Sequence, residues 1–151
     1  MTPKEHALAW FENVWNQKRE DYIRQYLRLE HDAPEEISGI GPPKEGDAAA
    51  KAIQSVDQFI AFWKAILKAI DPLRIDVRHV IESGDAACGI ADILGTDQRT
   101  GTEVCFQLGF WVRIQDDVIV EAENVVDFHR YLVQLDPEHE AILSDHFGGE
   151  A

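Results

Sequence analysis

The change of apolar period along the chain constrains its fold more than any other feature. Before residue 70 the apolar residues recur every three or four positions, as on one face of a helix. From Leu73 onward they recur at every second position, as in half-buried strands, and turn-forming residues at 84–85, 97–101 and 115–117 separate four such runs. Because helices come first and strands follow, the sequence predicts an α+β fold in which helices cover one face of a curved antiparallel sheet.

The expected helices precede the sheet. Two short ones cover 7–15 and 22–27, and the clearest one covers 56–70. Ser55 and Gln58 form a capping box at the start of this long helix. The strands are expected from Leu73 to the turn at 84–85, and over 86–94, 103–114 and 118–128.

A chain of 151 residues is long enough for one domain with one core. We expect a single domain over 1–151, with its core over 7–135 and a helical tail over 136–151. The glycine- and proline-rich stretch over 40–54 is either a lid or a surface insertion. A short strand could form just before it, over 36–40.

The charge balance excludes some partners. The chain has 14 basic and 28 acidic residues and a net charge of −14, which repels nucleic acid and anionic membrane surfaces. No apolar run approaches the ~18 residues that span a bilayer, and the N-terminus does not resemble a signal peptide. We therefore expect no nucleic acid partner, no membrane partner and a cytoplasmic location.

No pattern for a cofactor or metal is present. Cys88 and Cys105 are too few for a disulfide framework and are expected to be reduced packing thiols. The six histidines have no metal-binding spacing, and neither a glycine-rich phosphate loop nor a GxSxG elbow occurs. The sequence predicts a protein that works without a cofactor.

Six segments of the chain carry a family resemblance. They are WFENVWN (10–16), ISGIGP (37–42), VDQFIAFWKAI (56–66), DPLRIDVRHVIESGD (71–85), ILGT (93–96) and VRIQDDVIVEAENVVDFHRYLVQL (112–135). In order and spacing they resemble the SnoaL-like polyketide cyclase group of the nuclear-transport-factor-2-like superfamily. The resemblance implies a cone-shaped fold with a pocket inside its curved sheet, and a homodimer. That superfamily includes cyclases, isomerases, epoxide hydrolases, dehydratases and proteins without known catalysis.

Asp92 is the main catalytic candidate, because it interrupts an otherwise apolar strand. It shares a strand face with Ile90 and Leu94, and we expect that face to look into the interior. Phe106, Leu108, Phe110 and Val112 of the next strand would face the same interior. A carboxylate isolated in an apolar pocket can exchange protons near neutral pH. The alternative is that Asp92 binds a backbone amide at a bulge or reaches solvent.

Asn124, one strand further on, is the second catalytic candidate. Its amide could orient substrate or water, or stabilise a developing oxyanion. The positions of Asp92 and Asn124 match places where relatives similar to limonene epoxide hydrolase carry two acids around a water. Here the second acid is an amide, and Ile90 replaces the matching arginine, so that triad is incomplete.

Aromatic side chains are expected to close the pocket over an apolar ligand. The substrate-binding candidates on helices are Trp15, Tyr26, Phe59 and Trp63, and those on the third strand are Phe106, Leu108 and Phe110. Aromatic residues at helical spacing are also typical of a plain core. Ser38 occupies a position where the cyclase-like pattern often has a histidine, and its hydroxyl could touch ligand.

The sequence thus favours a cofactor-free enzyme of SnoaL-like type, acting by general acid/base chemistry on a hydrophobic oxygenated small molecule. Cyclisation, isomerisation, hydration and dehydration all remain open. The alternatives are a noncatalytic ligand-binding or dimerisation domain of the same fold and, third, an epoxide hydrolase. Trp111, Val125 and Ile93 are expected on the outer face of the sheet, where they would form a homodimer interface.

Overall fold

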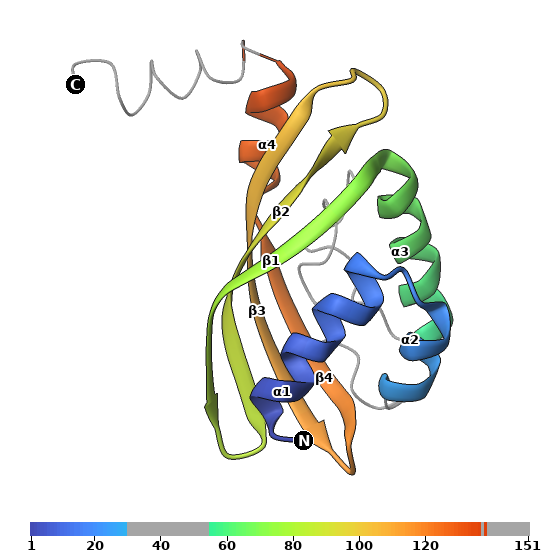
Figure 1. The fold of residues 1–151 in the computed structure, drawn as a ribbon, viewed down its shortest axis with the longest axis vertical. Coiled ribbons are helices and arrows are strands. Elements are labelled where there is room, and N and C mark those ends of the chain that lie inside the picture. Colours follow the sequence, from blue (N-terminus) through green and yellow to red (C-terminus); the bar gives the residue numbers. More distant parts are fainter. Residues whose placement is uncertain (30–54, 137, 139–151) are drawn as a thin grey trace, which may run out of the picture.

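The computed structural model describes residues 1–29, 55–136 and 138, and these form helices packed on one curved sheet. The helices are α1 (Pro3–Trp10), η1 (Phe11–Asn16, a π-helix that continues α1), α2 (Glu20–Tyr26), α3 (Val56–Ala69) and α4 (Phe128–Leu135). The strands are β1 (Ile70–Ser83), β2 (Ala86–Asp97), β3 (Glu103–Gln115) and β4 (Val118–Val126), antiparallel in the order β1-β2-β3-β4. Figure 1 shows α1 and α3 on the same side of the sheet. The α+β fold with N-terminal helices wrapped around a curved sheet is confirmed.

The N-terminal helices are fixed by side-chain hydrogen bonds at their ends. Thr2 and Glu5 form a reciprocal capping box at the start of α1, which satisfies two backbone N–H groups. At the end of η1, the Asn16 side chain donates to the Ile75 carbonyl (3.0 Å) and accepts from the Ile75 N–H (2.7 Å). Because β1 is an edge strand, this contact both satisfies its free backbone groups and holds η1 against the sheet.

Helix α3 follows the sequence prediction closely. Ser55 is its N-cap and accepts a hydrogen bond from the backbone N–H of Gln58 at 3.1 Å. The helix buries Phe59, Ile60 and Trp63. The Trp63 indole donates to the carbonyl of Val14 at 3.1 Å, which ties α3 to η1.

The pairing of β2 with β3 decides which side chains face the helices. Ala91 lies opposite Leu108, and Ile93 lies opposite Phe106. Directly paired residues share a face, so these four side chains all look toward the helices, and all are buried. The prediction that Ile93 lies on the outer face is therefore wrong.

Strand β1 contains a bulge that changes its phase. Val77 pairs with Ala91 and His79 with Ile90, so Arg78 has no partner residue on β2. Before the bulge, Leu73 and Ile75 are buried on the inner face. After it, His79 and Ile81 share the outer face with their partners on β2.

Helix α4 begins where we expected strand to continue. Strand β4 ends at Val126, and Asp127 caps α4 by accepting from the Arg130 N–H at 2.9 Å. Beyond the end of β4, the side-chain amide of Gln134 donates to the Cys105 carbonyl and accepts from the Cys105 N–H, both at 2.7 Å. Gln134 therefore takes the place of a ladder partner for β3.

Some predictions lie outside these residues. The stretch 40–54, the short strand over 36–40 and nearly all of the tail over 136–151 are not among the described residues. The single domain over 1–151 and the cytoplasmic location stay predictions. Within the described part, no helix is long and apolar enough to cross a membrane, and both cysteines are free thiols.

Candidate functional site

A cavity of about 290 Å³ lies between the inner face of the sheet and the helices. Its wall is apolar over most of its extent. The helices contribute Trp10, Phe11, Trp15, Phe59, Phe62, Ile66, Ala69, Phe128, Tyr131 and Leu132; the strands contribute Ile70, Leu73, Ile75, Ile93, Phe106, Leu108, Val112, Ile119, Ala122, Asn124 and Val126; Leu27 completes the wall. This hollow lies where the family resemblance implies a pocket, and its use as a binding pocket stays a prediction.

Asp92 does not face this cavity. It lies on the outer face of β2, between Asp76 of β1 and Gln107 of β3. Its side chain is 25% exposed and forms a salt bridge with Arg78, with 2.9 Å between Arg78 Nε and Asp92 Oδ2. The predicted inward orientation of Asp92 is wrong, and with it the observation on which its role as general acid/base depended.

The prediction for Asp92 is wrong because it assumed a different register between β2 and β3. Ile90, Asp92 and Leu94 do share one face, as expected, but Phe106 pairs with Ile93 rather than with a residue of that set. A shift of one residue moves every side chain of a strand to the opposite face. The bulge at Arg78 then places a guanidinium beside Asp92, which compensates its charge at the surface.

Asn124 does line the cavity, as expected. It lies opposite Phe110 on the inner face of β4 and is half-buried. Its side chain makes no hydrogen bond with any residue of the described part of the chain. Both its amide nitrogen and its amide oxygen are therefore available to a bound molecule.

Some of the predicted substrate-binding residues line the cavity, and others belong to the packed core. Trp15, Phe59, Phe106 and Leu108 line the cavity. Tyr26, Trp63 and Phe110 do not: Tyr26 lies over Tyr22 with ring centroids 4.4 Å apart, Trp63 binds Val14, and Phe110 packs on Phe11 at 4.7 Å. Phe110 also lies over Gly89, whose missing Cβ would come within 2.8 Å of the ring. Ser38 is outside the described residues.

Sequence reasoning missed the contribution of α4, which supplies Phe128, Tyr131 and Leu132 to the wall. The signal was present, because Phe128, Tyr131, Leu132 and Leu135 follow the i, i+3, i+4, i+7 spacing of an amphipathic helix. Asp127 directly before them is a typical N-cap residue. The strand expected over 118–128 runs through this cap and ends on the first residue of the helix.

Tyr131 is bound to a buried carboxylate next to the cavity. Its hydroxyl donates to Asp97, which is 3% exposed and also accepts from the Thr100 hydroxyl (2.8 Å) and the Thr100 N–H (3.0 Å). The hydrogen bonds from Tyr131 and Thr100 lower the pKa of Asp97, although burial opposes them. Burial, followed by the hydrogen bond to Asp97, raises the pKa of Tyr131. Tyr131 is therefore a neutral phenol that uses its proton in the hydrogen bond to Asp97.

The cavity can hold a ligand and orient it, but its described wall offers no charged group. The polar side chains in the described wall are those of Asn124, Tyr131, Trp10 and Trp15, and the Tyr131 hydroxyl already donates to Asp97. Among the residues at 1–29, 55–136 and 138, no group of three or more His, Cys, Asp or Glu could hold a metal ion.

The pair of Asp97 and Tyr131 makes stability depend on pH. Tyr131→Phe should lower the free energy of unfolding at pH 7 by about 1.5–3 kcal/mol, because it removes a hydrogen bond to a charged acceptor. The folded pKa of Asp97 lies below its ordinary 3.8, so this stability is present above that value and is lost as the pH falls through the folded pKa. Denaturant unfolding of both proteins at pH 7 and near pH 3 measures the difference, which should shrink at the lower pH.

Tyr26→Phe is the control, because its hydroxyl makes no hydrogen bond with any described residue. Its effect should not change between the two pH values. An effect of Tyr131→Phe that is equally large at both would contradict the assignment.

The chain matches the family model described as SnoaL-like domain over residues 7–122. No curated protein sequence matches it. Wild-type IdmH, a putative polyketide cyclase from Streptomyces antibioticus, has a similar structure (TM-score 0.73, 17% identity, 89% of this chain and 99% of that chain covered).

Two further structures are similar. One is AclR, a putative hydroxylase from Streptomyces galilaeus (TM-score 0.65, 20% identity, 89% and 97% covered), and the other is an NTF2-like protein from Burkholderia thailandensis (TM-score 0.67, 17% identity, 91% and 99% covered). At these identities the structures show a shared fold, and it is the sequence model that shows the family. Since the model spans most of the chain, this protein belongs to the SnoaL-like domain family.

Proposed function

We propose that the cavity binds a mainly hydrophobic, oxygenated small molecule. The observation that carries this proposal is a hollow of about 290 Å³ whose described wall is apolar apart from a few uncharged polar side chains. Small-molecule sites are typically concave and mostly apolar, with a small number of polar groups that fix orientation. Membership of the SnoaL-like family supports a ligand at this place in the fold.

Filling the cavity should weaken binding. Ala122 lies in the wall on β4, and Ala122→Phe would place a ring in the space that we assign to the ligand. We expect a neutral apolar fluorophore such as N-phenyl-1-naphthylamine to bind the native protein. Its affinity for the variant should be lower by at least about tenfold, because the new phenylalanine ring occupies the space that the fluorophore needs. Fluorescence titration measures this.

Ala61→Phe is the matched control, because Ala61 is exposed on α3 and is not part of the wall. It should bind the fluorophore as the native protein does. Unchanged binding in a folded Ala122→Phe protein would refute the cavity as the binding site.

Catalysis of the cyclase type is the second candidate function. IdmH, which has this fold, is described as a putative polyketide cyclase. Confining a flexible chain in a shaped cavity lowers the entropic part of a cyclisation barrier without an ionised side chain. Asn124 would donate from its amide nitrogen to a substrate oxygen and stabilise negative charge that develops there. Epoxide hydrolysis has no such support, because Asp92 lies on the opposite face of the sheet.

Asn124→Leu separates catalysis from binding. If the protein is a cyclase, the variant should lower kcat for a polyketide-like substrate by about 10²–10³, the usual loss of one oxyanion donor. Gln107→Leu, the same change at an exposed position of β3, should leave kcat unaltered. Turnover that Asn124→Leu leaves intact would remove Asn124 from the mechanism, and ligand binding without any turnover would favour the noncatalytic reading.

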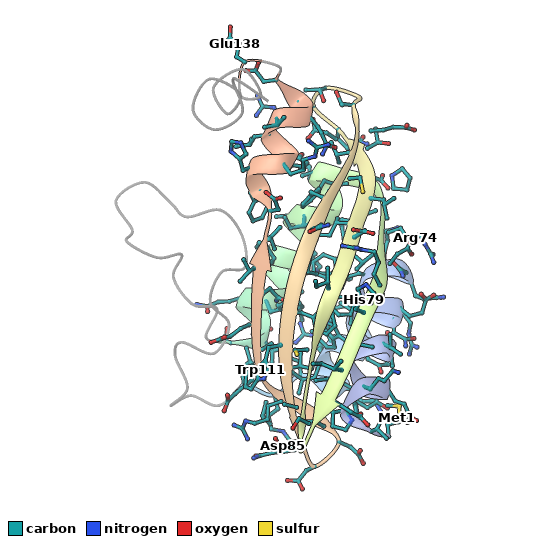
Figure 2. All side chains as sticks on the ribbon, turned by 90° about the vertical axis from the view of Figure 1, so that its left-hand side faces the viewer. Met1, Arg74, His79, Asp85, Trp111 and Glu138 are labelled. Carbon is teal, nitrogen blue, oxygen red and sulfur yellow. The ribbon has the colours of Figure 1, made fainter. Side chains whose placement is uncertain are left out.

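The outer face of the sheet is the proposed homodimer interface. It carries an apolar patch, here called the outer patch, made of Ile81, Cys88, Ile90, Trp111 and Val125. Figure 2 looks onto this face, with His79 and Trp111 labelled and the N-terminal helices behind the strands. Val125 is 77% and Ile81 69% exposed, which is a large apolar exposure for a sheet that no described helix covers on this side.

Four charged residues beside the outer patch are paired within the chain, whereas Glu123, which borders the same hollow opposite Trp111, makes no ion pair with a described residue. Arg78 binds Asp92, and Arg113 binds Glu121. A second copy could therefore approach without leaving these four charges uncompensated, and Glu123 would have to stay at the solvated rim of the contact.

Val125→Lys should dissociate the dimer, because it places a charge in the centre of a desolvated contact. Light scattering should give twice 17.1 kDa for the native protein and 17.1 kDa for the variant. Leu8→Lys, at an exposed apolar position on α1, should leave the mass unchanged. A native protein of 17.1 kDa at working concentration would contradict the interface.

A further inference from the structure

Two of the four tryptophans are buried without a hydrogen-bond acceptor for the indole N–H among the described residues. Trp10 is 7% and Trp15 is 9% exposed, and neither indole nitrogen makes a hydrogen bond with any residue of the described chain. The other two tryptophans differ from them. Trp63 donates to the Val14 carbonyl at 3.1 Å, and Trp111 lies on the outer face of the sheet.

An unpaired buried N–H is unusual and needs an explanation, because burial removes its water without replacing the lost hydrogen bond. Tryptophan indoles normally find an acceptor when they are buried. Both Trp10 and Trp15 line the cavity, and neither borders the outer patch. The cavity is thus a place where an acceptor for these two indoles can lie.

The two rings are neighbours in the cavity wall. Both contact Phe59, with ring centroids 5.6 Å from Trp10 and 6.4 Å from Trp15. A carbonyl oxygen has two lone pairs and no proton, so it suits a wall that presents donors. An anionic acceptor suits it less, because the described wall contains no cation to compensate a buried charge.

We propose that Trp10 and Trp15 are specificity-determining residues, which donate from their indole nitrogens to an acceptor oxygen of the ligand. The ligand class is then an uncharged, mainly apolar molecule that carries a carbonyl, as in a ketone, quinone or ester, on the side facing α1 and η1. This inference rests on the proposed binding function of the cavity and specifies which polar group the cavity recognises.

Two probes of nearly the same shape test this specificity. 2-Acetylnaphthalene carries a carbonyl where 2-isopropenylnaphthalene carries a methylene group, so they differ in the acceptor. We expect the native protein to bind the ketone about threefold to tenfold more tightly, the range of one net hydrogen bond. Isothermal titration at pH 7 gives both dissociation constants.

The four tryptophans supply matched variants. Trp10→Phe and Trp15→Phe should each reduce the ratio of the two dissociation constants toward one, even where they weaken both ligands through lost packing. Trp63→Phe and Trp111→Phe should keep the native ratio. A ratio that survives in both cavity variants, or that disappears in Asn124→Leu instead, would overturn the assignment to the indoles.

A spectroscopic measurement on the native protein covers the case in which a cavity variant does not fold. The indole N–H groups give separate signals in a nitrogen–proton correlation spectrum. The ketone should shift the Trp10 and Trp15 signals downfield relative to the isopropenyl probe and leave the Trp63 and Trp111 signals in place. Equal shifts with both probes would contradict the proposal, as would equal affinities, which would mean that water and not ligand satisfies the indoles.

Failure of this inference and failure of the binding function give different results. If neither naphthalene binds the native protein, the cavity is not a ligand site and both proposals fall. If both bind with equal affinity, the binding function stands and the indole specificity is wrong.

Discussion

The register between β2 and β3 determines what the interior of this protein contains. Ile93 faces Phe106 across the ladder and Ala91 faces Leu108, so an apolar row from each strand meets on the side covered by the helices. The same pairing sends Asp92 outward, where Arg78 compensates its charge. A pairing shifted by one residue would bury that carboxylate and expose Ile93. Both changes are unfavourable, because a charge loses its water and an apolar side chain becomes hydrated. The neutrality of the described cavity wall follows from this pairing.

The end of the cavity beside β4 is closed by helix rather than by sheet. Strand β4 stops at Val126, and α4 turns over the inner face, where it places Tyr131 edge-to-face on Phe106 with ring centroids 5.1 Å apart. Two polar contacts hold the helix there: Gln134 continues the ladder of β3 at Cys105, and Tyr131 binds Asp97 at the end of β2. The first contact satisfies backbone groups of β3 beyond the end of β4, and the second gives Asp97 Oδ1 a donor, so α4 is part of the fold and not an appended tail.

The sequence predicted those features that depend on periodicity along a single element. Helix α3, its cap at Ser55 and the four strands were predicted in this way, and so was the inward row from Phe106 to Val112. Features that depend on how two elements meet were not predictable in the same way. Alternation shows that Asp92 and Ile93 point to opposite faces, but the face that is buried follows from the partner strand and from the bulge at Arg78. Helix α4 was missed for a different reason. Its apolar residues have helical spacing, but the predicted strand over 118–128 included Asp127, which caps the helix.

The uncharged wall limits the chemistry that the described residues can perform. Tyr131 cannot act readily as an acid or a base, since burial and the Asp97 carboxylate both hold its proton in place. Asn124, Trp10 and Trp15 are neutral at every pH at which the protein is folded, so a reaction that they assist would draw on orientation, confinement and hydrogen bonds to a developing charge. Such a reaction suits a substrate whose own carbonyl groups make its carbon atoms acidic, because the substrate then needs a stabilised oxyanion more than a strong base. Trp10, Trp15 and Asn124, whose side-chain nitrogens have no acceptor among the described residues, would all serve that need, so the proposed function depends on hydrogen bonds to a polar group of the ligand and not on a catalytic carboxylate.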